Sequence, residues 1–281
     1  MKNNNFKIDF IGAGFSRCGT TWLYRCLKEH PEICMSEPKE TNFFQLEKPE
    51  SKLGHYSKFF LKCKKNQIKG EVNPSYATNE GARKKIKKVN PNIKILFIIR
   101  TPIERSISQY LYGNKYSKEK KININEKELK EKWGNKQHYY KYLKIWYNTF
   151  PKENIYIINL DEVEDKPRKT LENLYSFLEV DKNFIPSLIN QKENKIHKYY
   201  FPKTHKLLKK INKKIKKSPF LIKLINTLSL NKLAQKISKL NRKEIEKPEI
   251  SKKTRNYLKN QFKDEIIKLE ELTGKDLSSW K

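Results

Sequence analysis

The chain has 281 residues, and its 62 Lys and Arg against 31 Asp and Glu give a formal net charge of +31. This length suits one large α/β domain, and no internal repeat or Pro/Gly/Ser-rich linker divides it. The charge has two interpretations, a polyanionic partner or a coding bias toward Lys, Asn and Ile. Because the sequence lacks a zinc finger and an RNP1 segment, it disfavours general nucleic-acid binding.

The cysteines and the apolar runs indicate the cellular compartment in which we expect the protein. Cys18, Cys26, Cys34 and Cys63 form no C-x-x-C pair and lie near no His cluster, which disfavours a structural zinc site. We expect reduced thiols in a soluble, cytoplasmic protein. Asp9 interrupts the first apolar run, so a signal peptide is not expected, and no run reaches the roughly twenty residues that cross a bilayer.

The stretch from Phe6 to Leu27 predicts a strand, a tight turn and a helix. Residues 6–15 are apolar and β-prone, small residues at 12–14 break the run, and apolar residues return in 20–27. A turn of this kind points backbone N–H groups and the positive end of a helix dipole at one place beyond the strand. The stretch therefore predicts a phosphate or sulfate site.

Spacing within this turn resembles a Walker A loop. Gly14 and Gly19 have the G-x-x-x-x-G frame, but Thr20 stands where that motif has its Lys. The fixed cation lies inside the loop as Arg17, which also occupies the place of the third Gly of a dinucleotide-binding fingerprint. The loop thus offers a cation, a Gly-rich backbone and the hydroxyls of Thr20 and Thr21.

Residues 35–44 follow the end of the first helix at Pro31 and carry Glu40 in a loop or short strand. Phe43 and Phe44 should anchor this segment against the core. We therefore expect the Glu40 carboxylate to be held in a fixed place.

The most apolar run, residues 92–99, predicts a central parallel strand covered on both faces. It follows a shorter extended segment at 70–76 and ends in Arg100. Pro102 then predicts the first turn of a helix that carries Ser108. Arg100 and Ser108 could both reach a ligand at the carboxyl ends of the strands.

The remaining elements continue the alternation of strand and helix, which predicts an α/β fold with a central parallel sheet flanked by helices. They are a helix over 81–89, a mobile surface insertion over 118–136, a core-facing helix over 139–150 with Tyr140, Leu143, Tyr147 and Phe150 near helical spacing, a strand over 155–160, a helix after Pro167, and a final helix over 251–272 closed by Gly274.

Residues 195–247 form a basic segment. Its first part, 195–203, interleaves Lys with three aromatic residues at 199–201, and 205–245 contains an amphipathic stretch. Such a segment can cover a bound ligand as a lid, lie on a membrane surface, or pack on its own domain.

Four segments in this order carry a resemblance to a known family. They are Gly14–Leu23, Pro38-Lys39-Glu40 before Phe43-Phe44, Ile99–Arg105 with Ser108, and Leu272–Trp280. Together they resemble the sulfotransferases that use 3′-phosphoadenosine 5′-phosphosulfate (PAPS). The Pro-Lys-Glu segment before paired aromatics is similar to the glycan-type branch, which is heparan-sulfate-sulfotransferase-like and bacterial-type. The match covers most of the chain, apart from 118–136 and much of 206–247.

The resemblance implies a single P-loop-like sulfotransferase domain over 1–281, with PAPS as co-substrate, no metal, and a hydroxyl or amine acceptor on a carbohydrate or other small molecule. It implies that the Gly-rich loop binds the 5′-phosphosulfate, that Arg100 and Ser108 bind the 3′-phosphate, and that Glu40 is the catalytic base, with Glu71 and Glu37 as the next carboxylates to consider. The nucleotide-binding residues implied are Arg17, Cys18, Gly19, Thr20, Thr21, Trp22, Arg100, Ser108, Lys198 and Lys203.

The chemistry of sulfuryl transfer agrees with these residue types. The reaction needs an aligned acceptor hydroxyl, a base for its proton, and cations for the charge that gathers on the leaving phosphate. Glu40, Arg17 and the threonines suit these roles, with Arg17 counted as catalytic as well as nucleotide-binding.

Some features depart from the family, and other functions compete. Arg17 stands where many members have Lys, and the R-K-G-x-x-G segment and His base of the steroid- and phenol-sulfating branch are missing. A P-loop kinase that uses ATP and Mg²⁺ is the alternative enzyme, disfavoured by the absent P-loop Lys. A basic nucleic-acid or membrane-surface protein is the alternative without catalysis.

Overall fold

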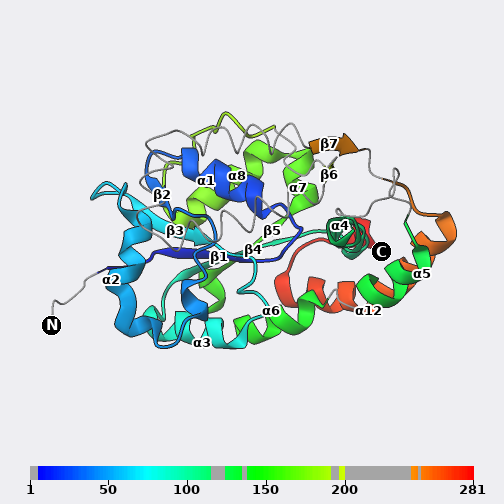
Figure 1. The fold of residues 1–281 in the computed structure, drawn as a ribbon, viewed down its shortest axis with the longest axis horizontal. Coiled ribbons are helices and arrows are strands. Elements are labelled where there is room, and N and C mark those ends of the chain that lie inside the picture. The colour runs from blue at the N-terminus through cyan, green and yellow to red at the C-terminus, as the bar shows by residue number, and fades with distance from the viewer. Residues whose placement is uncertain (1–5, 115–123, 135–137, 191–195, 200–241, 246–247) are drawn as a thin grey trace.

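The computed structural model describes residues 6–114, 124–134, 138–190, 196–199, 242–245 and 248–281 (Figure 1). The described residues contain a five-stranded sheet in the order β2-β3-β1-β4-β5, with every pair parallel. Its strands are β1 (Phe10–Gly14), β2 (Ile33–Met35), β3 (Ile68–Val72), β4 (Lys94–Ile99) and β5 (Ile155–Asn159). The predicted α/β fold with a central parallel sheet is confirmed.

Helices cover both faces of this sheet (Figure 1). The helices α1 (Thr20–Glu29) and α8 (Pro167–Leu178) lie on one face, and α3 (Glu80–Val89) and α6 (Tyr139–Tyr147) lie on the other. The long helix α12 (Lys252–Thr273) contacts α6 and α4 (Pro102–Gly113). The shorter elements are η1 (Phe43–Gln45), η2 (Pro49–Lys52), α2 (Leu53–Tyr56), η3 (Ser57–Phe60), α5 (Glu126–Glu128), η4 (Leu129–Trp133), η6 (Lys152–Asn154), α7 (Leu160–Asp165) and η7 (Ser278–Trp280).

Local sequence explains where the elements begin and end. Every residue of β1 is buried, which suits its apolar and small side chains at the centre of the sheet. In α4 the Thr101 hydroxyl accepts from the Glu104 amide at 3.5 Å, and Pro102 occupies the first turn, as predicted. Ser251 caps α12, and Gly274 ends it with a φ of 68°.

The buried face of α6 differs in part from the predicted one. Leu143 and Phe150 are buried as expected, but Tyr139 and Trp146 are buried in place of the half-buried Tyr140 and Tyr147. The Trp146 indole donates to the carbonyl of Ala77 at 2.9 Å. The helix is therefore turned so that its largest ring meets the sheet side of the domain.

Part of the predicted insertion at 118–136 is helical and packed. Residues 124–134 contain α5 and η4, and Leu129 is fully buried. The Glu126 carboxylate accepts from the Ser251 amide at 2.6 Å and from its hydroxyl at 2.8 Å, so α5 is joined to the start of α12. The rest of the range lies outside the described residues, and mobility of the insertion stays a prediction.

The basic segment 195–247 begins and ends in a two-stranded antiparallel sheet. β6 (Ile196–Tyr199) pairs with β7 (Arg242–Ile245), and Lys198 lies opposite Lys243. Nearly all of the amphipathic stretch 205–245 lies outside the described residues, as does Lys203. The lid and the membrane contact therefore stay predictions.

One expectation about the cysteines is wrong. Cys34 and Cys63 form a disulfide with a Cα–Cα distance of 5.4 Å, whereas Cys18 and Cys26 are buried thiols. The two partners are 29 residues apart, so only the folded chain brings them together, and spacing in the sequence gave no sign of it. The expectation of reduced thiols therefore fails for this pair, and the cytoplasmic location stays a prediction.

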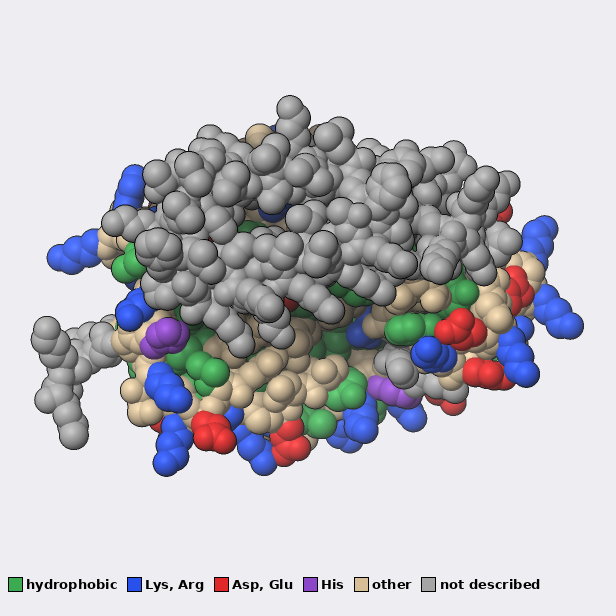
Figure 2. Space-filling view, in the orientation of Figure 1, with side chains coloured by type: hydrophobic (Ala, Val, Ile, Leu, Met, Phe, Trp, Pro, Cys, Tyr) green, Lys and Arg blue, Asp and Glu red, His purple; other side chains and the backbone are tan. Residues whose placement is uncertain are grey.

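Charges are dispersed on the coloured part of the face that Figure 2 shows. On the face shown in Figure 2, Lys and Arg side chains lie along the edges and alternate with Asp and Glu, without forming one large basic patch. Among the described helices, none combines the length and the apolar composition needed to cross a bilayer.

Candidate functional site

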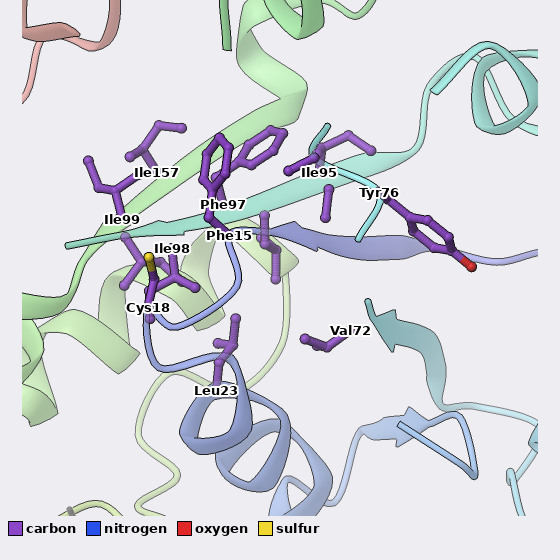
Figure 3. Packing of buried hydrophobic residues seen from close by; sticks show 14 of the residues in the cluster. Phe15, Cys18, Leu23, Val72, Tyr76, Ile95, Phe97, Ile98, Ile99 and Ile157 are labelled. Atoms are coloured by element: carbon purple, nitrogen blue, oxygen red, sulfur yellow. The ribbon is translucent and has the colours of Figure 1, made fainter. Parts of the chain in front are cut away.

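The loop between β1 and α1 wraps around the carboxyl end of β4. The Phe15 amide donates to the carbonyl of Ile98 at 3.0 Å. Figure 3 shows the Phe15 ring beside Phe97 on one side of β4, and the Cys18 side chain near Ile98 on the other. The two rings lie 5.7 Å apart, and Phe15 and Cys18 are both buried. The loop is therefore fixed to the strand from both faces.

The loop delivers an uncapped helix terminus. Arg17 and Gly19 adopt left-handed backbone conformations, with φ of 68° and 95°, directly before α1 begins at Thr20. The φ of Gly19 favours glycine, and a Cβ atom there would also lie 2.8 Å from Leu160 Cδ1. Among the described residues, no side chain caps α1, and its first turn contains no acidic residue. Its N–H groups and dipole are thus left for an external anion.

Arg17 joins the loop to α4. Its Nε donates to Ser108 Oγ at 3.0 Å, and its guanidinium lies 4.8 Å from the centre of the Tyr112 ring. Burial lowers the pKa of Arg17, Tyr112 acts in the opposite direction, and the charge of Arg100 lowers this pKa further. Arg17 and Arg100 are 83 positions apart in the sequence, but in the folded chain they are close enough to influence each other electrostatically.

Arg100 stands at the end of β4 and is paired with a carboxylate. Its guanidinium lies 3.5 Å from Glu104 Oε2, one helical turn into α4, and Glu104 also lies 3.4 Å from the guanidinium of Arg255. The Tyr139 hydroxyl donates to the Arg100 carbonyl at 3.0 Å. The backbone at Arg100 is thus fixed, and its side chain is held by an acidic partner that an anionic ligand could replace.

Arg105 supports the loop from α4. Its guanidinium contacts the rings of both Phe15 and Tyr139, 5.0 and 4.7 Å from their centres, and its Nε donates to the Ser16 carbonyl at 3.2 Å. Cys18 Sγ lies 3.2 Å from the Tyr139 hydroxyl, and burial raises the pKa of this thiol. The buried side chains of Arg105 and Cys18 therefore support the loop from the protein interior. Cys18 could contact a ligand only through its backbone.

Lys39 and Glu40 reach the same loop from the segment that follows β2. Lys39 Nζ donates to Thr20 Oγ1 and to Glu40 Oε1, each at 3.1 Å. The Lys39 side chain is 19% exposed, whereas that of Glu40 is 48% exposed. Burial lowers the pKa of Lys39, and Glu40 opposes this shift. The predicted base is therefore linked through one ammonium group to Thr20, where the predicted anion-binding loop between β1 and α1 ends (the anion loop).

Glu71 anchors the segment that carries Glu40. This buried carboxylate accepts from the Thr41 amide at 2.9 Å, the Thr41 hydroxyl at 2.8 Å and the Tyr56 hydroxyl at 2.6 Å. It also accepts from Tyr76 and Asn73. Burial raises the pKa of Glu71, and these hydrogen bonds oppose the rise. Because Glu71 is enclosed and fully used as an acceptor, its position suits support rather than proton transfer.

The Glu37 carboxylate is paired with two lysines on the surface and not with residues of the loop. Its carboxylate lies 2.5 Å from Lys28 Nζ and 2.9 Å from Lys62 Nζ, and these hydrogen bonds lower the pKa of Glu37 to about 2. Of the three carboxylates considered from the sequence, Glu40 is the one that the described contacts connect to the anion loop.

Residues 7–278 match the family described as the sulfotransferase domain. The chain belongs to this sulfotransferase family. Heparan sulfate glucosamine 3-O-sulfotransferase 5 of mouse is 30% identical over 181 residues, which cover 60% of this chain and 52% of that protein. The membrane-associated sulfotransferase kil1 of Dictyostelium discoideum is 29% identical over 116 residues, covering 40% of this chain and 24% of that protein. The matched part of the chain thus spans about half the length of the first relative and about a quarter of the length of the second.

A solved sulfotransferase shares the fold. The crystal structure from Alicyclobacillus acidocaldarius has a TM-score of 0.66 and 20% sequence identity, and the match covers 98% of this chain and 99% of that one. The resemblance to sulfotransferases drawn from the sequence motifs is confirmed by the family match.

In this sulfotransferase the described contacts bring some of the predicted site residues together at the loop and leave others apart from it. Those that the described contacts bring together at the loop are Arg17, Cys18, Gly19, Thr20, Glu40, Arg100 and Ser108. Thr21 follows on the exposed side of α1. The Trp22 side chain is buried, and its indole donates to the Ile189 carbonyl at 3.2 Å. The roles of all these residues toward a nucleotide stay predictions.

Sequence reasoning missed Lys39 and Arg105. Lys39 stands directly before Glu40, and its ammonium contacts Thr20, the residue at the position of the missing P-loop Lys. That missing Lys was the available signal, since a phosphate loop without its usual cation invites a search for one elsewhere. Nothing in the local pattern distinguished Arg105, because its contacts to Phe15 and Tyr139 exist only in the folded chain.

A cavity of about 470 Å³ opens beside the loop. It lies between the loop, the turn after β3, α4 and the start of α6, and its lining is Phe15, Ser16, Pro74, Ser75, Thr78, Arg105, Gln109, His138 and Tyr142. The described lining contains no Asp or Glu and offers hydroxyl, amide and imidazole groups beside aromatic rings. Such a surface suits a hydroxyl-bearing molecule.

Proposed function

We propose that this chain transfers the sulfuryl group of PAPS to a hydroxyl or amine of a carbohydrate acceptor. One observation carries the proposal, namely that an uncapped helix terminus, the Arg17–Ser108 pair and the Lys39–Glu40 pair meet around one loop. Sulfuryl transfer needs an anion site and a base side by side, and this arrangement supplies both.

The donor would occupy the loop and the adjoining end of β4. The 5′-phosphosulfate suits the α1 N-terminus with Arg17, Thr20 and Thr21, and the 3′-phosphate suits Arg100 and Ser108. The hydrogen bond between Arg17 and Ser108 supports this division, because it makes the two anion sites neighbours. Lys198 and Lys203 are proposed as further contacts from the basic lid.

Glu40 would act as the general base. The acceptor oxygen attacks sulfur as its proton passes to the Glu40 carboxylate, and the bond between sulfur and the bridging phosphate oxygen breaks. The electron pair of that bond leaves with the phosphate, so the products are the sulfated acceptor and 3′-phosphoadenosine 5′-phosphate (PAP). Arg17 stabilises the charge that develops on the leaving phosphate.

The acceptor would enter the cavity beside Ser16. Its hydroxyl, amide and imidazole groups can hydrogen-bond a sugar, and Tyr142 offers an aromatic face. The names of the heparan sulfate sulfotransferase relatives support a glycan as the acceptor class.

The test combines donor binding with acceptor screening. Calorimetric titration should detect binding of PAP, with ATP and Mg²⁺ as the control ligand, and labelled sulfate should pass from PAPS to one class among glycans, lipids and small alcohols. The Glu40→Gln variant should bind PAP like the wild type, while turnover falls by about 10²–10⁴-fold. Binding of ATP and Mg²⁺ without PAP would refute the proposal, and normal turnover in Glu40→Gln would remove this residue from the mechanism.

A further inference from the structure

One ammonium group is shared between the two halves of the site. Lys39 Nζ donates to the Oγ1 atom of Thr20, which is the first residue of α1, at 3.1 Å. It also donates at 3.1 Å to Oε1 of Glu40, its own neighbour in the sequence. A lysine ammonium has three N–H donors, so one further donor remains after these two contacts. The Lys39 side chain is largely buried, which makes exchange of its partners with water less favourable.

The backbone around this pair is held in place, so a change at the pair must come from the side chains. Ser36 Oγ donates to the Lys39 carbonyl at 3.4 Å, and the Thr41 amide donates to the buried Glu71 carboxylate at 2.9 Å. Phe43 and Phe44 are buried immediately afterwards. Lys39 and Glu40 therefore stand on a short length of chain that is fixed at both ends.

The loop also lacks a lysine of its own at the usual position. Thr20 occupies the place of the P-loop Lys, and Lys39 brings an ammonium to its hydroxyl from a different segment. A lysine provides a compact charge on a flexible stem, which allows it to follow a group that moves during transfer.

We propose that Lys39 binds the sulfuryl group of the donor and that donor binding thereby releases Glu40. This inference rests on the proposed function. Without donor, the ammonium is shared between Thr20 and Glu40; with donor, it turns to the sulfuryl oxygens and leaves Glu40 Oε1 to accept the acceptor's proton. Lys39 keeps its own proton throughout, so the change is an exchange of hydrogen-bond acceptors.

The exchange has a chemical advantage. Glu40 Oε1 already accepts a hydrogen bond from the Lys39 ammonium, so this oxygen is engaged while the ammonium stays in place. It would thus become available to the acceptor hydroxyl only when a sulfuryl group has drawn the ammonium away. Donor binding would precede productive acceptor binding.

The first test compares the affinities for PAPS and for PAP, which lacks the sulfuryl group. Lys39→Met keeps the apolar stem and removes the charge, so affinity for PAPS should fall about tenfold to a hundredfold while affinity for PAP changes little. Lys39→Arg should recover part of the loss. Lys62→Met is the matched control, because Lys62 bonds Glu37 on the same segment and its side chain is 82% exposed. This control should bind both ligands like the wild type.

The second test examines the competition itself. Glu40→Gln removes the charge that holds Lys39, so its affinity for PAPS should rise several-fold above that of the wild type, and the rise should vanish in Lys39→Met/Glu40→Gln. Thermal melting must show that each variant folds. If Lys39→Met weakens PAPS and PAP equally, or if Glu40→Gln does not tighten PAPS, the inference fails although the wild type still transfers sulfate. If the wild type binds neither ligand, the proposed function fails instead.

Discussion

At the scale of single residues, the cations of the site are already occupied. Arg100 is paired with Glu104, Lys39 with Glu40, and Arg17 with the hydroxyl of Ser108. An anionic ligand therefore competes with partners in place, which orients each side chain before the ligand arrives.

Arg100 and Ser108 should contribute differently to nucleotide binding. Arg100→Ala should lose about 1.5–3 kcal/mol of binding free energy for PAP, but little for the analogue without the 3′-phosphate. Ser108→Ala should weaken both ligands, because Ser108 Oγ also holds Arg17. Calorimetry with the two ligands measures this difference.

Arg168→Ala offers the control for this comparison. Arg168 pairs with Glu172 one helical turn on, as Arg100 does with Glu104, but the Arg168 side chain is 67% exposed whereas that of Arg100 is 15% exposed. Its loss should leave both affinities unchanged. Equal losses for the two ligands in Arg100→Ala would contradict a role at the 3′-phosphate.

At the scale of elements, the segment between β2 and η1 depends on one buried carboxylate. Burial raises the pKa of Glu71, so the folded state binds its proton more tightly than the unfolded state does. The stability contributed by protonation is complete below the ordinary value of 4.5 and is lost as the pH rises toward the raised pKa. The wild type should therefore lose stability relative to Glu71→Gln as the pH rises above 4.5.

Urea unfolding at several pH values measures this trend. Glu37→Gln is the opposite case, because the Glu37 pKa is lowered to about 2 and its stabilising effect is lost only as the pH falls toward that value. Above pH 5 its stability curve should run parallel to that of the wild type. Parallel curves for Glu71→Gln as well would contradict a raised pKa of Glu71 in the folded protein.

The disulfide ties β2 to the chain that leads into β3. Cross-linking residues 29 apart in sequence should stabilise the fold by about 3 kcal/mol, chiefly through the unfolded state. Cys34→Ala/Cys63→Ala should lower the free energy of unfolding by about this amount. A reducing agent should destabilise the wild type similarly and leave the double variant unaffected; if the wild type does not respond, the two thiols are unpaired in solution.

At the scale of the whole molecule, the sequence predicted what depends on local pattern. Apolar runs predicted the strands, Pro102 and Gly274 marked the start and the end of helices, and the small residues at 12–14 marked the loop between β1 and α1. These signals are local because backbone geometry and burial of consecutive residues produce them.

The remaining features depend on contacts between distant segments. The bond between Lys39 and Thr20, the support of the loop by Arg105, and the Cys34–Cys63 disulfide each join residues whose separation hides their relation. The rotation of α6 was missed because two adjacent aromatic pairs, at 139–140 and 146–147, offer equally good apolar faces. The sequence of this segment alone does not determine which of the two faces packs against the sheet.

The attachment of the anion loop to β4 has a consequence during synthesis on the ribosome. Phe10 and Gly12 of β1 pair with Lys94 and Leu96, and the Phe15 amide bonds to Ile98. A nascent chain that stops before β4 contains the complete loop sequence but lacks the strand around which the loop is wrapped. Because such long-range pairing must be completed before the loop gains its shape, the nucleotide would bind only after β4 has emerged and docked. Measuring nucleotide binding to ribosome-arrested chains of increasing length would therefore show at which chain length β4 inserts into the sheet.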